Sequence, residues 1–183
     1  MVFETERLIL RNFKETDFDD YWEYAKDERV GPRAGWKAYT DPEKARERVL
    51  IEASKTNQFA IVLKSENKVI GSVELMECKK DRYKNLDIEE GAKEIGAVLS
   101  YDYWGQGYMP EAVKEIMRYA FEELGVPVIY CGHAKANTNS GRLQEKCGFR
   151  VVGELANYRE WVDGTVTSLI ERKMTREEYF EMK

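Results

Sequence analysis

Apolar and polar positions along the chain follow the two-residue period of strands in some segments and the 3.6-residue period of helices in others. The strand patterns cover residues 7–13, 59–64, 69–78, 94–99, 128–134, 149–155 and 168–173. The helix patterns cover residues 17–26, 41–55, 110–124 and 140–147, with a short final segment after residue 175. This order mixes hairpins with crossovers. It predicts an α/β (α+β) protein in which helices cover the faces of one mixed sheet.

Residues that favour helix ends and turns stand at several of these boundaries. Asp41, followed by proline, predicts a helix start, and Gly125 suits the position just after a helix. The Asp-Gly pair at 163–164 predicts a turn between the last two strands. The mostly charged residues 79–90 predict a loop in contact with solvent.

Length and composition favour a single domain spanning residues 1–183. Domains typically hold about 100–150 residues, and a hydrophobic fraction of 43% is enough for a core. No apolar run approaches the ~20 residues that a membrane-spanning helix needs. The first residues also lack the basic-then-apolar layout of a signal peptide. We therefore expect a cytoplasmic protein that does not bind membranes.

The cysteines, the histidine and the net charge narrow the classes of partner. Cys78, Cys131, Cys147 and the single His133 have no metal-ligand spacing, so we expect reduced thiols and no metal. A net charge of −5 argues against binding to nucleic acid and mildly favours a cationic partner.

Residues 94–124, a strand, a loop and a helix, carry the clearest chemistry. Gly105 and Gly107 allow a tight turn and the close approach of a ligand. The amides of residues 106–109 would be unpaired donors at a helix N-terminus, and Pro110 fits the first turn. This arrangement predicts an anion site suited to a pyrophosphate. The alternative is a plain strand-to-helix connection, because Gly-x-Gly alone is common in such turns.

The loop resembles the acetyl-CoA loop of the GNAT superfamily of N-acetyltransferases, whose pattern is (Gln/Arg)-x-x-Gly-x-(Gly/Ala). Here it reads Trp104-Gly105-Gln106-Gly107-Tyr108-Met109. Gly107 matches strictly, whereas Trp104 and Met109 depart from the pattern. The form is similar to the RimJ/RimL-like branch, which acetylates the N-termini of ribosomal proteins and in which Tyr-Trp-Gly-x-Gly is usual.

Further landmarks follow in the order expected of that branch. Residues 5–11 resemble its opening strand, and residues 120–125 resemble the end of its central helix. Asn137-x-x-Ser140 and the run at 145–149, Glu-Lys-Cys-Gly-Phe, resemble its later signature. The resemblance covers about residues 4–174. It implies a GNAT-like acyl-CoA N-acyltransferase fold with a mostly antiparallel sheet of about seven strands, and acetyl-CoA as cosubstrate.

The resemblance also implies which residues bind acetyl-CoA. The loop amides of residues 105–109 would hold the pyrophosphate. Backbone amides of Val98 and Leu99, with Ser100 as a further candidate, would hold the pantetheine arm and polarise the thioester carbonyl. Asn137 would contact pantetheine; its alternative is a local turn bond. Ser140 is also expected among the cofactor-binding residues.

Catalytic roles are implied for two residues. Ser140 stands where the branch places a serine as general acid, since the tyrosine used by many GNAT enzymes is replaced by Gln144. The alternative for Ser140 is a helix N-cap. Glu160 stands where the branch has a glutamate proposed as general base; its alternative is a solvated surface residue. His133 is interpreted as a core or edge histidine.

The acceptor site would be lined by Trp36, Tyr158 and Trp161, with Tyr39 nearby, although each could serve packing alone. The implied reaction is direct transfer of acetyl to a primary amine, in the first place a protein N-terminal α-amine. Two alternatives stay open. They are a small amine such as a polyamine or antibiotic, and an inactive CoA-binding regulator. A monomer or a homodimer is expected.

Overall fold

The computed structural model describes residues 1–160 and 164–183. The chain forms two compact units. Met1–Glu74 and Ala97–Glu115 make the first, and Leu75–Gly96 and Ile116–Lys183 make the second. Two strands and one helix contribute residues to each unit, so the chain passes between the units within regular elements.

The first unit holds the N-terminal strands and helices. Its strands are β1 (Val2–Glu4), β2 (Leu8–Arg11), β3 (Gln58–Leu63), the first residues of β4 (Lys68–Glu77) and the last of β5 (Lys93–Leu99). Its helical segments are η1 (Glu15–Asp17), α1 (Phe18–Ala25), α2 (Gly31–Ala34), α3 (Pro42–Ser54), η2 (Tyr101–Tyr103) and the start of α4 (Tyr108–Arg118). The predicted start of α3 is confirmed, because the Asp41 side chain accepts a hydrogen bond from the amide of Glu43.

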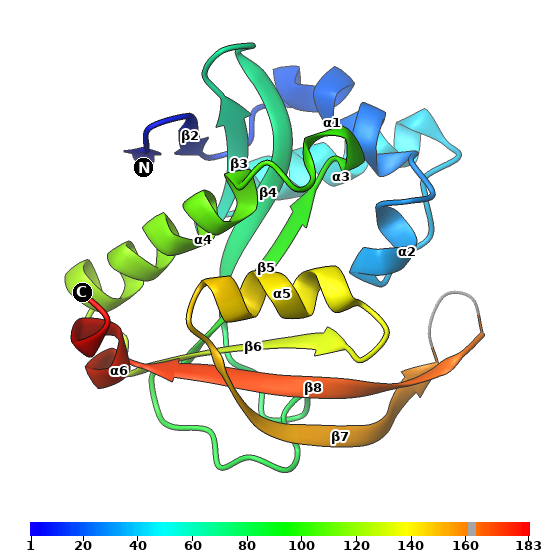
Figure 1. Cartoon of the computed structure of the whole chain (residues 1–183). Helices are drawn as coiled ribbons and strands as arrows, with labels where there is room; N and C mark the ends of the chain where they lie inside the picture. Colours follow the sequence, from blue (N-terminus) through cyan, green and yellow to red (C-terminus); the bar gives the residue numbers. More distant parts are fainter. Residues whose placement is uncertain (161–163) are drawn as a thin grey trace. The chain divides into compact units, whose positions relative to one another are not determined.

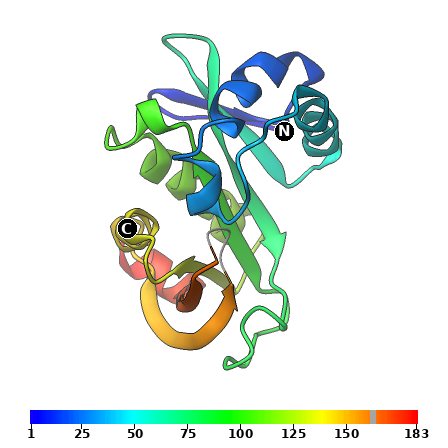
Figure 2. The same ribbon diagram turned by 90° about the vertical axis from the view of Figure 1, so that its right-hand side faces the viewer.

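The core of this unit lies on the strands. All six residues of β3 are buried, as expected for a strand whose two faces are both covered. Helices α1 and α3 lie against one face of β3 and β4, and the start of α4 lies over the other (Figures 1 and 2). Tyr24, Val49 and Val62 join α1, α3 and β3 in one apolar cluster.

The second unit holds the C-terminal half. Its strands are the end of β4, the start of β5, β6 (Val128–Ala134), β7 (Arg150–Glu160) and β8 (Val166–Thr175). Its helices are the end of α4, the π-helical turn η3 (Tyr119–Glu123), α5 (Thr138–Lys146) and α6 (Arg176–Glu181). Gly125 has a φ of 67°, which fits the predicted helix end.

The described strands form one eight-stranded sheet in the order β1-β2-β3-β4-β5-β6-β8-β7. β5 and β6 run parallel, whereas β1–β2, β2–β3, β3–β4, β6–β8 and β7–β8 are antiparallel. The prediction of a mixed, mostly antiparallel sheet flanked by helices is confirmed. The strand number was underestimated, because β1 has only three residues and so shows hardly one period of alternation.

Different segments cover the two faces of β6 and β8. Helix α5 covers one face (Figure 1). On the other face, Tyr83 and Ile88 pack in a cluster with Tyr130 and Leu169. The prediction of a merely solvated loop at residues 79–90 was therefore wrong, since Tyr83 is 0% exposed. One aromatic residue within a charged run is enough to bury part of the loop.

Two glycines flank a buried carboxylate on the same strands. Glu171 on β8 pairs with Gly132 on β6 and with Gly153 on β7. A Cβ atom at Gly153 would lie 2.4 Å from Oε2 of Glu171, so a side chain there would displace the carboxylate. Glu171 is 0% exposed, its oxygens have no hydrogen-bond partner among the described residues, and burial raises its pKa.

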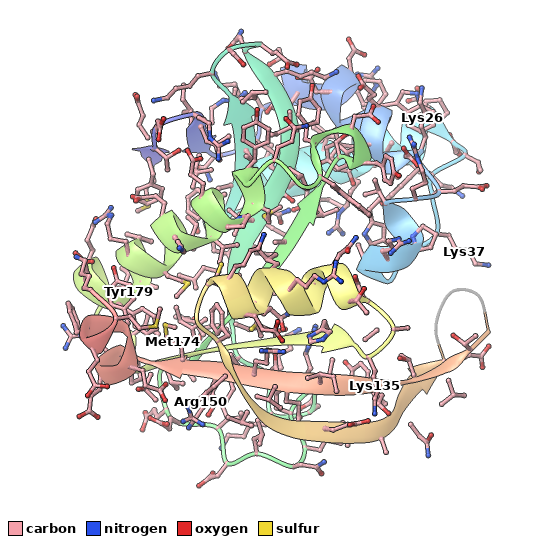
Figure 3. All side chains as sticks on the ribbon, viewed as in Figure 1. Lys26, Lys37, Lys135, Arg150, Met174 and Tyr179 are labelled. Atoms are coloured by element: carbon pink, nitrogen blue, oxygen red, sulfur yellow. The ribbon has the colours of Figure 1, made fainter. Side chains whose placement is uncertain are left out.

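Helix α6 closes one end of the second unit. Arg150 at the start of β7 pairs with Glu178, and Tyr179 stacks on Phe121 at a centroid distance of 4.9 Å. Figure 3 shows Arg150, Met174 and Tyr179 near this end of β7 and β8. Farther along, β7 bends strongly (Figure 2), where its register with β8 shifts and Asn157 has a φ of 50°.

Candidate active site

The predicted anion site is a loop that joins β5 to α4 in the first unit. Gly105 and Gly107 have φ values of 77° and 85°, in the left-handed region that favours glycine. Helix α4 begins at Tyr108, two residues before the predicted start, and Pro110 remains in its first turn. The left-handed Gly107 therefore turns the chain directly into the helix.

The amides of this loop are donors without protein acceptors. The amides of Gln106, Gly107, Tyr108 and Met109 form no hydrogen bond to any residue that the structure describes. Unpaired amides at a helix N-terminus, with the positive end of the helix dipole behind them, favour an anion. A Cβ atom at Gly105 would meet no described atom within 4 Å, so its surroundings are open. These features fit a pyrophosphate.

Aromatic side chains hold the strand side of the loop. The indole Nε1 of Trp104 donates to the carbonyl of Leu99 at 2.8 Å, and Tyr101 packs on Trp104. The hydroxyl of Tyr103 donates to Glu66 at 2.6 Å. Met109, which replaces the small residue of the GNAT pattern, has its side chain in the core. The two departures from that pattern thus have packing roles.

Arg7, between β1 and β2, contacts the same loop together with Glu111 in the first turn of α4. Nε of Arg7 donates to Oε2 of Glu111 at 2.7 Å, and its Nη1 donates to the carbonyl of Gln106 at 2.9 Å. Sequence reasoning missed this pair, because its partners lie 104 residues apart. The only signal was an acidic residue in the first turn of α4.

The end of β5 supplies fewer candidate amides than expected. The amide of Ser100 donates to the carbonyl of Ile70 at 2.8 Å, so Ser100 is not available as a third donor. The register of β5 with β6 covers Lys93 and Glu94 alone among the described residues, so β5 leaves that pairing early. The roles of Val98 and Leu99 stay predictions.

In the second unit, Asn137 and Ser140 occupy the start of α5. Asn137 is the N-cap, and its side chain accepts a hydrogen bond from the amide of Ser140 at 3.3 Å. Ser140 is the third helical residue, so its alternative reading as the N-cap was wrong. The local bond suggested as an alternative for Asn137 is present, and its contact with pantetheine stays a prediction.

A buried chain of hydrogen bonds supports the Ser140 hydroxyl. Nε2 of Gln144 donates to Oγ of Ser140 at 3.3 Å, and Oε1 of Gln144 lies 2.8 Å from Nδ1 of His133. Burial lowers the pKa of His133, which favours the neutral imidazole. Because Nε2 of Gln144 donates to Ser140, its Oε1 is the acceptor that faces Nδ1 of His133. Because Ser140 accepts from Gln144, its own proton is directed elsewhere. His133 is a core histidine, as expected.

Glu160 and Tyr158 lie at the far end of β7. Glu160 is exposed, as its alternative reading as a surface residue requires, and it remains open to solvent for a role as base. Tyr158 is half-buried and packs against the cluster around Tyr83. The predicted role of Trp161 falls outside the described residues.

Trp36 and Tyr39 lie together in the first unit. Their rings meet edge to face at 5.7 Å, and both pack against the cluster of α1 and α3. Trp36 also lies 2.8 Å from the position of a Cβ atom at Gly31, so this glycine makes room for the indole. The pair is half-buried, which suits a wall with one open side.

An open hollow of about 440 Å³ lies beside the start of the loop in the first unit. It is lined by Glu23, Lys26, Asp27, Arg29, Ser100 and Asp102. Its three carboxylates are paired: Arg29 contacts Asp27 at 2.6 Å and Asp102 at 3.9 Å, and Lys68 contacts Glu23 at 2.6 Å. The hollow therefore offers little unpaired negative charge to a ligand.

Among the described residues, no group of three or more His, Cys, Asp or Glu side chains could hold a metal ion. Within the same residues, no helix is long and apolar enough to cross a membrane.

Known proteins resemble the chain along almost its whole length. A family model described as an acetyltransferase (GNAT) domain matches residues 7–150. The uncharacterized N-acetyltransferase p20 of Bacillus licheniformis is 29% identical over 178 residues, which are 92% of this chain and 96% of the relative. A GNAT-family acetyltransferase structure from Bacillus anthracis has a TM-score of 0.84 at 25% identity, covering 97% of this chain and 100% of that one.

Two further structures have the same fold but different acceptors. The ribosomal-protein-S5-alanine acetyltransferase from Vibrio fischeri has a TM-score of 0.75 at 24% identity, covering 98% of each chain. The spermidine N-acetyltransferase from Vibrio cholerae, solved in complex with CoA and spermine, has a TM-score of 0.77 at 18% identity. That match covers 96% of this chain and 99% of the other.

Proposed function

Because the chain belongs to the GNAT acetyltransferase family, we propose that it transfers acetyl from acetyl-CoA directly to a primary amine, in the first place to a protein N-terminal α-amine. The observation that carries the proposal is the loop before α4. Gly105 and Gly107 are left-handed, and four successive amides from Gln106 to Met109 have no acceptor among the described residues. A pyrophosphate supplies the acceptors that these donors lack.

The proposed reaction has one bond formed and one broken. The amine nitrogen attacks the thioester carbonyl carbon, and the carbon–sulfur bond then breaks. Ser140 gives its hydroxyl proton to the leaving thiolate and regains a proton from solvent, and Gln144 supports this role by donating a hydrogen bond to the same oxygen. Glu160, directly or through water, takes the proton that the amine loses. The amides of Val98 and Leu99 polarise the carbonyl, and Asn137 contacts the pantetheine arm.

The acceptor is the least constrained part of the proposal. The Tyr103–Met109 sequence, similar to the RimJ/RimL-like branch, supports a protein N-terminus, and Trp36 and Tyr39 supply an aromatic wall for its first residues. The structural neighbours act on a ribosomal protein in one case and on spermidine in another, so the shared fold supports each acceptor class equally. We further propose a single functional domain, cytoplasmic, as a monomer or homodimer.

A thiol-release assay with acetyl-CoA tests the function. Peptides with a free N-terminus and no lysine are compared with the same peptides N-acetylated in advance, and with spermidine and an aminoglycoside. Turnover with the free peptides alone supports the proposal, and mass spectrometry should place the acetyl group on the α-amine. Turnover with spermidine or the aminoglycoside alone would indicate that the acceptor is a small amine and not a protein N-terminus. Tight CoA binding without any turnover would indicate a regulator.

A further inference from the structure

Arg7 connects the β1–β2 turn to the loop that precedes α4. Its guanidinium donates to the carboxylate of Glu111 through Nε and to the carbonyl of Gln106 through Nη1, at 2.7 and 2.9 Å. The same group lies 4.5 Å from the ring centre of Tyr108, and Nη2 lies 3.3 Å from the position of a Cβ atom at Gly107. One side chain therefore contacts Gln106 and Tyr108 and lies beside Gly107.

The bond to the Gln106 carbonyl sets the direction of the next amide. In a trans peptide the C=O and the following N–H point in opposite directions. None of the described peptide bonds is cis. With the carbonyl of Gln106 held toward Arg7, the amide of Gly107 must point away from Arg7. That amide is one of the four donors without a protein acceptor.

Because Glu111 balances the charge of Arg7, the effect of Arg7 on the loop comes mainly from the orientation of its hydrogen bonds. Burial raises its pKa, but hydrogen bonds from Thr5 and from the amide and side chain of Arg7 lower it, and the lowering is larger. The ionised carboxylate therefore neutralises the guanidinium. The amide of Glu111 also donates to the carbonyl of Gly107, so Arg7, Glu111 and the loop form one closed set of bonds.

We propose that Arg7 is a positioning residue that holds the loop amides in the orientation that binds the pyrophosphate of acetyl-CoA. It acts through the carbonyl of Gln106 and does not touch the acceptor or the thioester. The inference rests on the proposed function, since it takes the loop as the pyrophosphate site. It assigns a role to a residue outside the loop and the helix.

The test compares two thioesters that differ in the pyrophosphate. Acetyl-CoA carries it, and S-acetylpantetheine lacks both the pyrophosphate and the adenosine. For Arg7→Ala and Arg7→Lys, we expect the KM for acetyl-CoA and the calorimetric Kd of CoA to rise about tenfold, with kcat changed less than about twofold. Lysine keeps the charge but lacks the planar fork. The kcat/KM for S-acetylpantetheine should stay at the wild-type value.

Arg11→Ala is the matched control, because Arg11 on β2 also binds a carboxylate, that of Asp17, away from the loop. It should lower the melting temperature and leave the Kd of CoA unchanged.

An unchanged Kd for both Arg7 variants would overturn the proposal, as would equal losses with the two thioesters. If Arg7→Ala does not fold, Glu111→Gln keeps the shape of the side chain and weakens its hydrogen bonds with Arg7. A raised Kd of CoA for Glu111→Gln would then support the proposal, and an unchanged Kd would overturn it. Absence of turnover by the wild type would contradict the proposed function, whereas CoA calorimetry would still test Arg7.

Discussion

Replacing each loop glycine by alanine separates backbone strain from close approach. At both positions alanine must adopt a positive φ, 77° at Gly105 and 85° at Gly107, and the left-handed conformation costs an L-residue about 1–2 kcal/mol. The new methyl at Gly105 would meet no described atom within 4 Å. At Gly107 it would lie 3.3 Å from Nη2 of Arg7, which must move by a few tenths of an ångström. The two variants thus share the strain but not the contact.

The strain also sets the size of the effect on binding. A variant loop that relaxes out of the left-handed conformation must return to it when CoA binds. A cost of about 1–2 kcal/mol corresponds to a factor of roughly 5–30 in an equilibrium constant. We expect Gly105→Ala to weaken CoA by no more than this factor. Gly107→Ala should weaken it further, because it also disturbs the Arg7 contact and places a methyl where the pyrophosphate approaches.

Calorimetric titration of CoA at one ionic strength measures both variants, and thermal unfolding checks that each is folded. Gly107→Val should be the weakest binder, since β-branched residues almost never have a positive φ. Wild-type affinity in folded Gly107→Ala would refute the assignment of the loop as the pyrophosphate site. A larger loss for Gly105→Ala than for Gly107→Ala would refute the close-approach argument.

The remaining predictions concern carboxylates and the Ser140 hydroxyl. Ser140→Ala should lower kcat about 100-fold or more and change the Kd of CoA far less; a wild-type rate would remove the acid role. Glu160→Gln should lower kcat without changing the melting temperature. Glu154→Gln, also exposed on β7 but paired with Lys135, should leave kcat unchanged. Glu171→Gln should raise the melting temperature at pH 7. A raised pKa means that the folded state holds the proton to higher pH than the unfolded state, so stability falls as pH rises above the unfolded value of about 4.3. The gain in melting temperature should therefore vanish near pH 4. An equal gain at pH 4 and pH 7 would show that ionisation of Glu171 is not its cause.

Local sequence pattern predicted most of the regular elements because their causes are local. Asp41, which caps the start of α3, and Gly125, which follows the end of η3, act on their own neighbours and were predicted correctly. The short β1 was missed because its stability comes from pairing with β2 and not from its own three residues. Tyr83 was misread because burial depends on a sheet face formed far along the chain.

The candidate site divides in the same way. The left-handed glycines follow from the loop sequence itself, which predicted a tight turn, whereas α4 begins two residues before its predicted start. The anion site stays a prediction. The contact of Arg7 with the loop was not predicted. Every residue has a backbone carbonyl, so a hydrogen bond to one gives no signal in the residue type. The cap of α5 was assigned to Ser140 as an alternative, although Asn137 has the same chemistry three residues earlier and takes the position.

The π-helical turn η3 at the end of α4 also determines where the chain tolerates a change in length. A π turn holds one residue more than the α-helical turn it replaces. Deleting one residue from Tyr119–Glu123 can restore an α-helical turn and leave the residues before and after it in their present phase. A deletion within Tyr108–Arg118 would instead rotate all that follows by about 100°, since 3.6 residues complete a turn. Natural variants of this chain that are shorter by one residue should therefore have lost it at η3.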